Sequence, residues 1–332
     1  MFVNPEVTVI IPAYNTAVYI AKAIQSALNQ TLHNIEVIVV DDASTDNTLE
    51  VVKTFSDERL KILKNPCNAG VSVTRNRALR EAKGQWIALL DSDDWYAQNR
   101  LEELLKIAEM TEADIICDDI AFMHLGENTP WSTLLKQSGQ QIEENKQVDP
   151  VYFVETGIYG RQGLHLGLSK PLFKRDFLLH NHIFYNEKLR VVEDFHFALN
   201  CLISGAKFIF VPTPYYFYLR RPGSLVTQGK VKHIDQFNDA ILDLMENKNA
   251  QISPQLKHCL SKNLQELQRN RVYYNVVEPF KQKRLKQAFL NALSKPSFFW
   301  YFTMRLQAVL TRRIQYYLLG NKSAFQVLHG NK

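Results

Sequence analysis

Short apolar runs alternate with amphipathic segments along the first 118 residues. Runs at 7–12, 35–40, 60–63 and 86–90 are rich in Val, Ile and Leu, and each is expected to be a strand. Segments at 17–28, about 46–55, 71–82 and around 101–108 have helical spacing, and another apolar strand is expected at 114–119. The run 35–40 has almost no polar alternation, which is typical of a strand covered on both faces. This order predicts an α/β fold with a Rossmann-like, mostly parallel sheet and helices on both faces.

The rest of the chain has a less regular pattern. The polar stretch 126–147 indicates an exposed insertion, and 207–219 reads as a strand, a proline-marked break and a second strand. From about Val231 the pattern is helical. Asp46 or Thr45 is expected to cap the second helix.

Polar side chains collect where the predicted strands end. "PAYN" follows the first strand, "DDASTD" the second and "DSDD" the fourth. Ligands of open α/β sheets bind beyond the carboxyl ends of the strands, so these segments predict a site at that edge. Asp41 or Asp42 is suited to accept hydrogen bonds from a base or a ribose hydroxyl. A turn with a helix cap would explain the neighbouring Ser44, Thr45 and Asp46 equally well.

The acidic segment 91–94 raises an electrostatic question, because three carboxylates within four positions repel one another. Alternate residues of an extended chain point the same way, so Asp91 and Asp93 are expected to converge on Mg²⁺ or Mn²⁺. The alternative is a solvated acidic turn at the start of the following helix.

Composition is ordinary for a folded protein of 332 residues, with 46% hydrophobic and 22% charged side chains. The four cysteines are widely spaced, which favours a reducing, cytoplasmic compartment. The N-terminus lacks a basic segment and a cleavage site, so no signal peptide is expected. No apolar run is long enough for a spanning helix.

Charge is distributed unevenly along the chain. Residues 281–332 contain ten Lys or Arg and no Asp or Glu, whereas residues 1–280 contain 29 basic and 34 acidic side chains. This basic, aromatic tail predicts peripheral contact with the inner face of the cell membrane through residues 281–320. Packing of the tail on the protein or on a second copy remains open. No nucleic-acid-binding motif accompanies the charge, so nucleic acid is not an expected partner.

Six segments, in this order, resemble the family 2 glycosyltransferases of GT-A type: "VTVIIPAYN", "AIQSALNQT", "EVIVVDDASTDNT", "NAGVSVTRNRAL", "GQWIALLDSDDWY" and "NRLEELL". Segments 168–199 and 215–224 are also similar to the second half of that family. The resemblance covers residues 5–225. It implies a GT-A domain at 1–225, with a nucleotide-sugar half at 5–118 and an acceptor half at 119–225, followed by a helical region with a basic tail at 226–332.

The resemblance implies a UDP-sugar donor, a glycan or lipid-linked glycan acceptor, Mn²⁺ or Mg²⁺, and inversion at the anomeric carbon. The nucleotide would be bound by Pro12, Ala13, Tyr14, Asn15, Asp41, Asp42 and Arg75. Asp91, Ser92 and Asp93 would form the DXD motif, in which Asp93 holds the metal and Asp91 contacts ribose or metal. Arg220, Arg221 and Ser224 lie where the family often closes a loop over the diphosphate.

A base is also needed, because the attacking acceptor hydroxyl must lose a proton. The resemblance assigns this role to Asp194, with Glu193 the next candidate. Acids here also suit a helix N-terminus, and both roles are compatible. His196 is favoured as a residue at the edge of the core over a ligand.

Competing classes fit less well. A phosphoacceptor receiver domain would require a Lys after the fifth strand, and "DIICDD" offers none. A dinucleotide-binding enzyme would require G-x-G-x-x-G after the first strand, but "PAYNTA" there has no glycine. A non-catalytic nucleotide-sugar-binding protein of the same fold remains the alternative. The sequence is also compatible with an oligomer.

Overall fold

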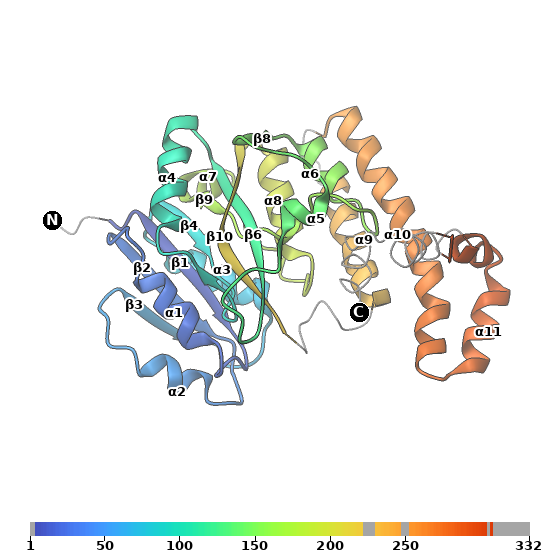
Figure 1. Cartoon of the computed structure of the whole chain (residues 1–332), viewed down its shortest axis with the longest axis horizontal. Helices are drawn as coiled ribbons and strands as arrows, with labels where there is room; N and C mark the ends of the chain where they lie inside the picture. Colours follow the sequence, from blue (N-terminus) through green and yellow to red (C-terminus); the bar gives the residue numbers. More distant parts are fainter. Residues whose placement is uncertain (1–3, 222–229, 247–251, 304–305, 308–332) are drawn as a thin grey trace.

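The computed structural model describes residues 4–221, 230–246, 252–303 and 306–307, which form one ten-stranded mixed sheet with helices packed around it (Figure 1). Eight of its strands follow the order β3-β2-β1-β4-β9-β6-β10-β5, while β7 pairs with β6 and β8 with β10.

The first half of the sheet is parallel, as predicted. Its strands are β1 (Val7–Ala13), β2 (Ile35–Asp41), β3 (Leu60–Lys64) and β4 (Trp86–Leu89). The intervening helices are α1 (Ile20–Leu28), α2 (Thr48–Lys53), α3 (Val71–Glu81) and α4 (Arg100–Thr111). Nearly every residue of β1 and β2 is buried, which confirms that both faces are covered.

Two predicted details of the helices are wrong. The first helix begins at Ile20 rather than at residue 17, because Thr16 starts a turn in which its carbonyl accepts the N–H of Tyr19. The N-cap of α2 is Asn47, which makes no side-chain cap bond. Asp46 instead accepts hydrogen bonds from the backbone and hydroxyl of Thr48.

The second half of the sheet departs from the parallel pattern. The short strand β9 (Leu172–Lys174) lies between β4 and β6 (Ile115–His124) and is antiparallel to both. β10 (Phe208–Arg220) runs parallel to β6 and antiparallel to β5 (Trp95–Tyr96). The predicted break at 207–219 is wrong, because β10 is one strand whose register shifts on both sides of Pro214.

The predicted insertion at 126–147 contains regular structure. It forms β7 (Ser132–Thr133) and α5 (Leu134–Ser138) and leads into β8 (Lys146–Val148). The Asp119 carboxylate of β6 accepts the N–H of Leu135, which fixes this segment to the sheet. The following elements are α6 (Pro150–Thr156), the 3₁₀ turn η1 (Leu166–Leu168) and α7 (Arg175–His180).

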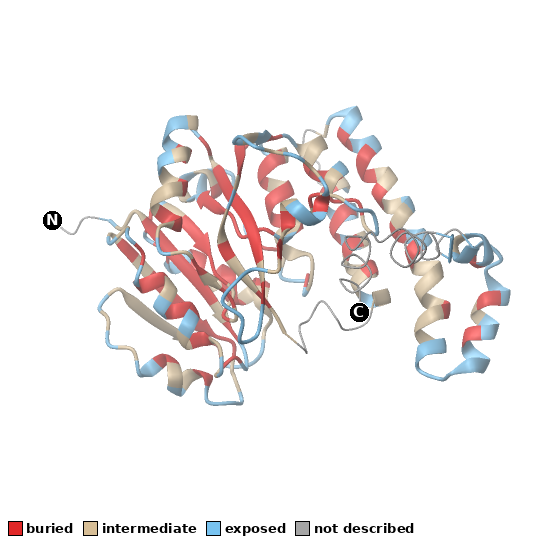
Figure 2. Ribbon diagram, viewed as in Figure 1, coloured by how far each residue is buried: buried red, intermediate tan, exposed pale blue. Residues whose placement is uncertain are grey.

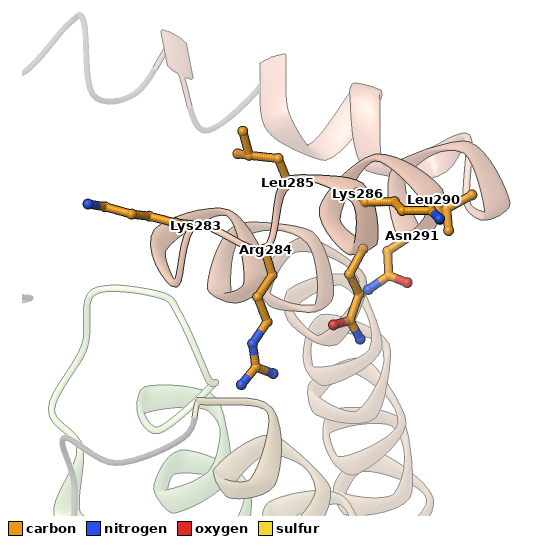
Figure 3. Close-up of a pocket in the computed structure, with 7 residues that line it drawn as sticks. Lys283, Arg284, Leu285, Lys286, Leu290 and Asn291 are labelled. Atoms are coloured by element: carbon orange, nitrogen blue, oxygen red, sulfur yellow. The ribbon is translucent and has the colours of Figure 1, made fainter.

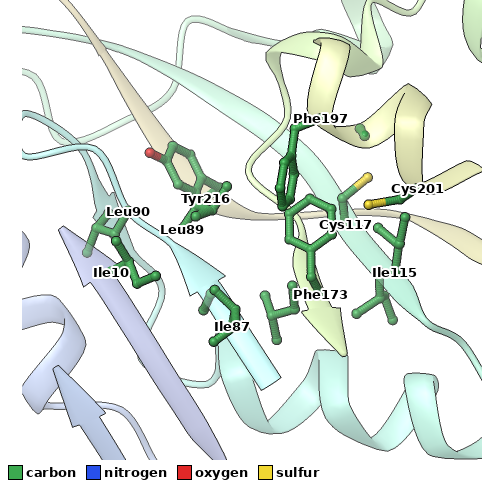
Figure 4. Packing of buried hydrophobic residues seen from close by; sticks show 14 of the residues in the cluster. Ile10, Ile87, Leu89, Leu90, Ile115, Cys117, Phe173, Phe197, Cys201 and Tyr216 are labelled. Carbon is green, nitrogen blue, oxygen red and sulfur yellow. The ribbon is translucent and has the colours of Figure 1, made fainter. Parts of the chain in front are cut away.

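The core forms where the two halves of the sheet meet. Figure 4 shows Ile10 of β1, Ile87 of β4, Phe173 of β9 and Ile115 of β6 following one another across the sheet. All four side chains are at most 2% exposed. The aromatic ring of Phe197, on α8 (Glu193–Ile203), packs edge-on against Phe173. This contact joins α8 to the core.

The C-terminal part of the described chain is helical, as predicted. It comprises α8 (Glu193–Ile203), which precedes β10, and then α9 (Lys230–Glu246), α10 (Pro254–Lys281) and α11 (Leu285–Ser294). The second half of α10 and α11 project from the body, and α11 carries much more exposed surface than the sheet (Figures 1 and 2). Within the described ranges, no helix combines the length and apolarity needed to cross a bilayer.

Candidate active site

The sheet brings three of the predicted polar segments to one edge. β1 pairs in parallel with β2 on one side and with β4 on the other, so their carboxyl ends are neighbours. Asn15, Asp42 and Asp91 follow these three strand ends. The predicted site edge is therefore present as one continuous surface.

Asp42 organises the loop before α3. Its carboxylate accepts hydrogen bonds from the Asn65 amide at 2.7 Å and from the backbone N–H groups of Ala69 at 2.9 Å and Gly70 at 2.8 Å. The side chain of the neighbouring Asp41 accepts long bonds from the Ser44 N–H. These bonds shape the corner in which a nucleotide base was expected.

The "PAYN" segment lies against the same corner. Pro12 and Ala13 pair with Val40 and Asp41 of β2. The Ala13 carbonyl then accepts the N–H of Asp42, the next residue after β2. Asn15 has a positive φ of 52° and accepts the Thr45 N–H at 2.8 Å. Tyr14 beside it is 45% exposed, which leaves its ring accessible to a ligand.

The acidic segment 91–94 is a tight turn and not the extended chain that the alternation argument assumed. The N–H of Asp94 donates to the Asp91 carbonyl at 3.0 Å, and Ser92 is buried within the turn. The Asp93 carboxylate is 22% exposed and accepts a bond from Arg221 Nε at 2.6 Å. Burial, followed by the charge of Asp91, raises the pKa of Asp93. A cation at Asp93 would relieve this unfavourable charge.

Asp94 faces inward from the turn and joins it to β10. It accepts bonds from the Tyr216 hydroxyl at 2.6 Å and from the Leu219 N–H at 2.8 Å. Burial, and then the charges of Asp93 and Asp91, raise its pKa well above the usual value. Asp94 therefore fixes the turn to β10 through these two bonds.

Five charged side chains form the centre of the site, and we call them the ion-pair cluster: Arg75, Asp91, Lys170, Glu193 and Asp194. The Arg75 guanidinium is 1% exposed and lies 2.8 Å from Asp91, 2.8 Å from Glu193 and 2.7 Å from Asp194. Lys170 Nζ lies 2.9 Å from Asp91 and 2.5 Å from Asp194. The cluster thus joins the turn after β4 to the start of α8.

Lys170 is the main component that the sequence analysis missed. It lies in "LSKP", where a single Lys between apolar residues carries no distinctive spacing. Its carbonyl accepts a 2.6 Å bond from Arg100, and Arg100 itself forms a buried ion pair with Asp118 at 2.7 Å. The backbone at Lys170 is therefore fixed by a second buried pair. Tyr185, also absent from the prediction, donates a long bond to Asp194.

The cluster holds its charges by mutual attraction. Burial alone would raise the pKa of Asp91, but Lys170 and Arg75 outweigh it and lower the pKa to about 2. Burial would lower the pKa of Lys170, yet Asp194 and Asp91 raise it above its ordinary value. Glu193 differs, because burial and the charge of Asp194 raise its pKa. Both acids of α8 lie in its first turn, where the helix dipole favours negative charge.

His196 lies at the edge of the core, as favoured from the sequence. Its Nε2 lies 2.8 Å from Asp243 of α9, and burial lowers its pKa. Arg220 lies over the ring of Trp131, whereas Arg221 is in contact with Asp93. Ser224, the third residue of the predicted diphosphate loop, lies outside the described residues.

The carboxylates at this edge of the sheet suit a metal ion that takes most of its coordinating atoms from water and from a bound substrate. Across the described ranges, no group of three or more His, Cys, Asp or Glu side chains is arranged to hold a metal ion. Both oxygens of Asp91 are in ion pairs, whereas Asp93 forms its ion pair, with Arg221, through Oδ2. Mg²⁺ commonly uses one or two carboxylates and completes its shell with water and phosphate oxygens.

The mixed sheet and the helices packed on it form the GT-A fold, which solved structures share. S. aureus TarS 1-349 in complex with UDP-GlcNAc superposes with a TM-score of 0.63 at 21% identity, over 93% of this chain and 85% of that one. A mannosyltransferase from Pyrobaculum calidifontis in complex with GDP-Man and Mn²⁺ gives 0.57 at 18% identity, over 98% and 86% of the two chains.

Sequence comparison supplies the family. Residues 8–161 match the family model described as glycosyl transferase family 2. The succinoglycan biosynthesis protein ExoO of Rhizobium meliloti is 30% identical over 93% of this chain and 87% of its own length. A cholesterol galactosyltransferase of Borreliella burgdorferi is 29% identical, over 69% of this chain and 64% of its own. The chain belongs to glycosyltransferase family 2.

Proposed function

We propose that the protein is an inverting, metal-dependent glycosyltransferase that moves a sugar from a UDP-sugar to a hydroxyl of a glycan or lipid-linked acceptor. One observation carries this proposal: Lys170 and Arg75 bridge Asp91, on the donor side, and Asp194, at the start of α8. Such a transferase needs one acidic group near the leaving diphosphate and another near the acceptor hydroxyl, and we assign these roles to the segment 91–93 and to Asp194.

On the donor side, we assign base and ribose binding to residues 12–15 and to Asp41 and Asp42. Asp93 would hold Mn²⁺ or Mg²⁺ together with the diphosphate, and the ion would neutralise charge on the departing diphosphate. Arg221, which pairs with Asp93, would move to the diphosphate in this scheme, since both partners are anionic. Asp91 acts mainly by orientation, because metal binding would require it to leave Arg75 or Lys170.

On the acceptor side, Asp194 is assigned as the general base. The acceptor oxygen forms a bond to the anomeric carbon while the bond to the diphosphate breaks, and Asp194 takes the hydroxyl proton. Arg75 and Lys170 hold this carboxylate in place through ion pairs of 2.7 Å and 2.5 Å. Glu193 has a raised pKa and is the second candidate for the base.

The biological role is proposed from the named relatives. ExoO is named for succinoglycan biosynthesis, which supports a role in cell-surface polysaccharide or lipooligosaccharide synthesis. TarS was solved with UDP-GlcNAc, which supports a UDP-sugar carrying a hexose or an N-acetylhexosamine. We further propose that residues 1–225 carry the transfer chemistry, and that residues 281–320 contact the inner face of the cell membrane.

A donor screen tests the proposal. Purified protein is incubated with UDP- and GDP-sugars, with Mn²⁺ or Mg²⁺ and with or without a chelator, and release of the nucleotide diphosphate is measured. We expect turnover of a UDP-sugar that is lost with the chelator. Release only from GDP-sugars would contradict the donor assignment.

The Asp93→Ala variant tests the metal ligand. We expect it to lower turnover by about 10²–10³-fold, the range found when a group that stabilises transition-state charge is removed. Asp57→Ala is the matched control, because Asp57 also pairs with an Arg and is similarly exposed at 26% but lies before β3. Metal-dependent turnover that survives Asp93→Ala would contradict the metal assignment.

A further inference from the structure

The large apolar side chains of α11 are mostly exposed, although the helix packs on α10. Its buried residues are the small Ala288 and Ala292, which lie against α10. Leu285, Phe289 and Leu293 recur every four residues along a line that borders this contact and are 55–65% exposed, as is Leu290. Helices normally turn their large apolar side chains towards the core. The exposed stripe therefore needs an apolar partner outside this packing.

Aromatic side chains continue this surface after α11. Phe298 turns inward and stacks on Tyr273 of α10. Phe299, Trp300 and Phe302 remain exposed, at 53%, 67% and 40%. Trp and Phe on the apolar side of a basic helix are typical of segments that lie in a membrane interface.

Cations border the apolar stripe. Lys283, Arg284 and Lys286 line an open hollow of about 600 Å³ at the start of α11, together with Leu285 and Leu290 (Figure 3). All three are exposed, and no Asp or Glu occurs anywhere in 281–332. This hollow is formed by α11 and the turn before it, separately from the ion-pair cluster.

We propose that α11 and the segment to Phe302 form a docking face for a bilayer that contains anionic lipids. The apolar stripe would enter the interface, and Lys283, Arg284 and Lys286 would contact lipid phosphates. A symmetric contact with a second copy would bring these cations together without an acid on the segment to offset them. Residues 308–332 carry further cations and no acid, so they would not neutralise the face either. The inference deepens the membrane contact proposed above by naming its residues and its lipid class.

Vesicle sedimentation with the full-length chain tests this face. Vesicles of phosphatidylcholine with phosphatidylglycerol are compared with vesicles of phosphatidylcholine alone, at low and high salt. We expect selective, salt-sensitive binding to the anionic vesicles. K283Q/R284Q/K286Q should weaken it by about fivefold per removed cation. F289S/L293S should also lower binding, because it removes two side chains of the stripe.

Matched controls separate the face from general surface effects. K53Q/K83Q/K136Q removes three exposed cations from the body of the protein, and M110S removes an apolar side chain that is 85% exposed on α4. Neither should change vesicle binding.

Three outcomes would overturn the inference: no binding to anionic vesicles, equal loss in the face and control variants, or a change of oligomeric state in F289S/L293S with vesicle binding unchanged. The assay contains no sugar donor. Failure of docking with intact sugar transfer would therefore reject this face alone, and docking without transfer would reject the proposed enzyme alone.

Discussion

At the scale of single residues, the centre of the site is a problem of buried charge. Arg75 and Lys170 place two positive charges among three carboxylates, and both cations are less than 10% exposed. Removing one member of a buried charge group leaves an uncompensated charge, which costs about 3–5 kcal/mol. Each of these side chains therefore affects stability as well as the geometry of the reacting groups.

Lys170→Met provides a test of the bridge between Asp91 and Asp194. We expect donor binding to be kept but kcat to fall by about 10²-fold, because both acids lose one of the two cations that they share. Lys174→Met is the control, since this Lys is exposed at the end of β9, close to Lys170 in the sequence. The measurement is kcat and donor Kd with a thermal unfolding curve for each variant. A kcat equal to that of the control would show that the bridge has no part in transfer.

The sequence could predict which acids lie at the site but not how each is bound. Asp42 and Asp93 were expected from their places after apolar strands, and Asp194 from the family resemblance. A turn at 91–94 was expected only as a solvated alternative, and the inward Asp94 was missed, because its partners Tyr216 and Leu219 lie more than a hundred residues away. Lys170 was missed for the same reason, since its partners come from two distant segments.

At the scale of elements, the position of α8 depends on its contact with η1. A Cβ added to Gly167 would lie 2.9 Å from Cβ and 3.4 Å from Cα of Phe195, the residue after Asp194. The absence of a side chain at Gly167 therefore allows α8 to approach the turn. This close approach helps to place the first turn of α8 within reach of Lys170.

Gly167→Ala should shift the start of α8 away from the ion-pair cluster. We expect a loss of about 1–3 kcal/mol of stability, the usual cost of overpacking, with a lower kcat. Leu168→Ala, at a neighbouring side chain that is 48% exposed, should leave both quantities nearly unchanged. Urea unfolding and initial rates measure the two effects. Unaltered stability and rate in Gly167→Ala would mean that the contact does not position α8.

The first half of the sheet could be predicted because its strands follow local apolar runs. β9 could not, since three residues in "PLFK" carry too little pattern, yet they separate β4 from β6. The bend of β10 was taken for a break, because Pro cannot donate to a ladder; the register shifts beside Pro214 accommodate it within one strand.

At the scale of the whole molecule, the described chain has a large core and a small separate one. The small cluster consists of Val276, Ala288, Ala292 and Phe298, with neighbours on α10. Leu256, Leu260 and Leu267, from the earlier part of α10, belong to the main core. The catalytic unit and α11 are thus stabilised by largely different contacts.

Truncation at two places tests this division. Of the core residues in the described ranges, a chain ending at Gln282 loses only Ala288, Ala292 and Phe298 of the small cluster, so we expect the main unfolding transition and donor turnover to be retained. A chain ending at Glu246 loses the α10 residues of the main core and should unfold at a clearly lower temperature. Calorimetry distinguishes the two. A large fall in Tm for the longer truncation would show that α11 is part of the catalytic unit.

The central claim is that Asp194 acts on the acceptor side of a sugar whose leaving group lies near Asp93. The most direct measurement is single-turnover transfer by Asp194→Asn with the UDP-sugar found in the donor screen, with donor Kd measured alongside. We predict an unchanged donor Kd and a transfer rate lower by about 10²–10⁴-fold, the usual contribution of a general base. Near-normal transfer in Asp194→Asn, with a large loss in Glu193→Gln instead, would contradict the claim.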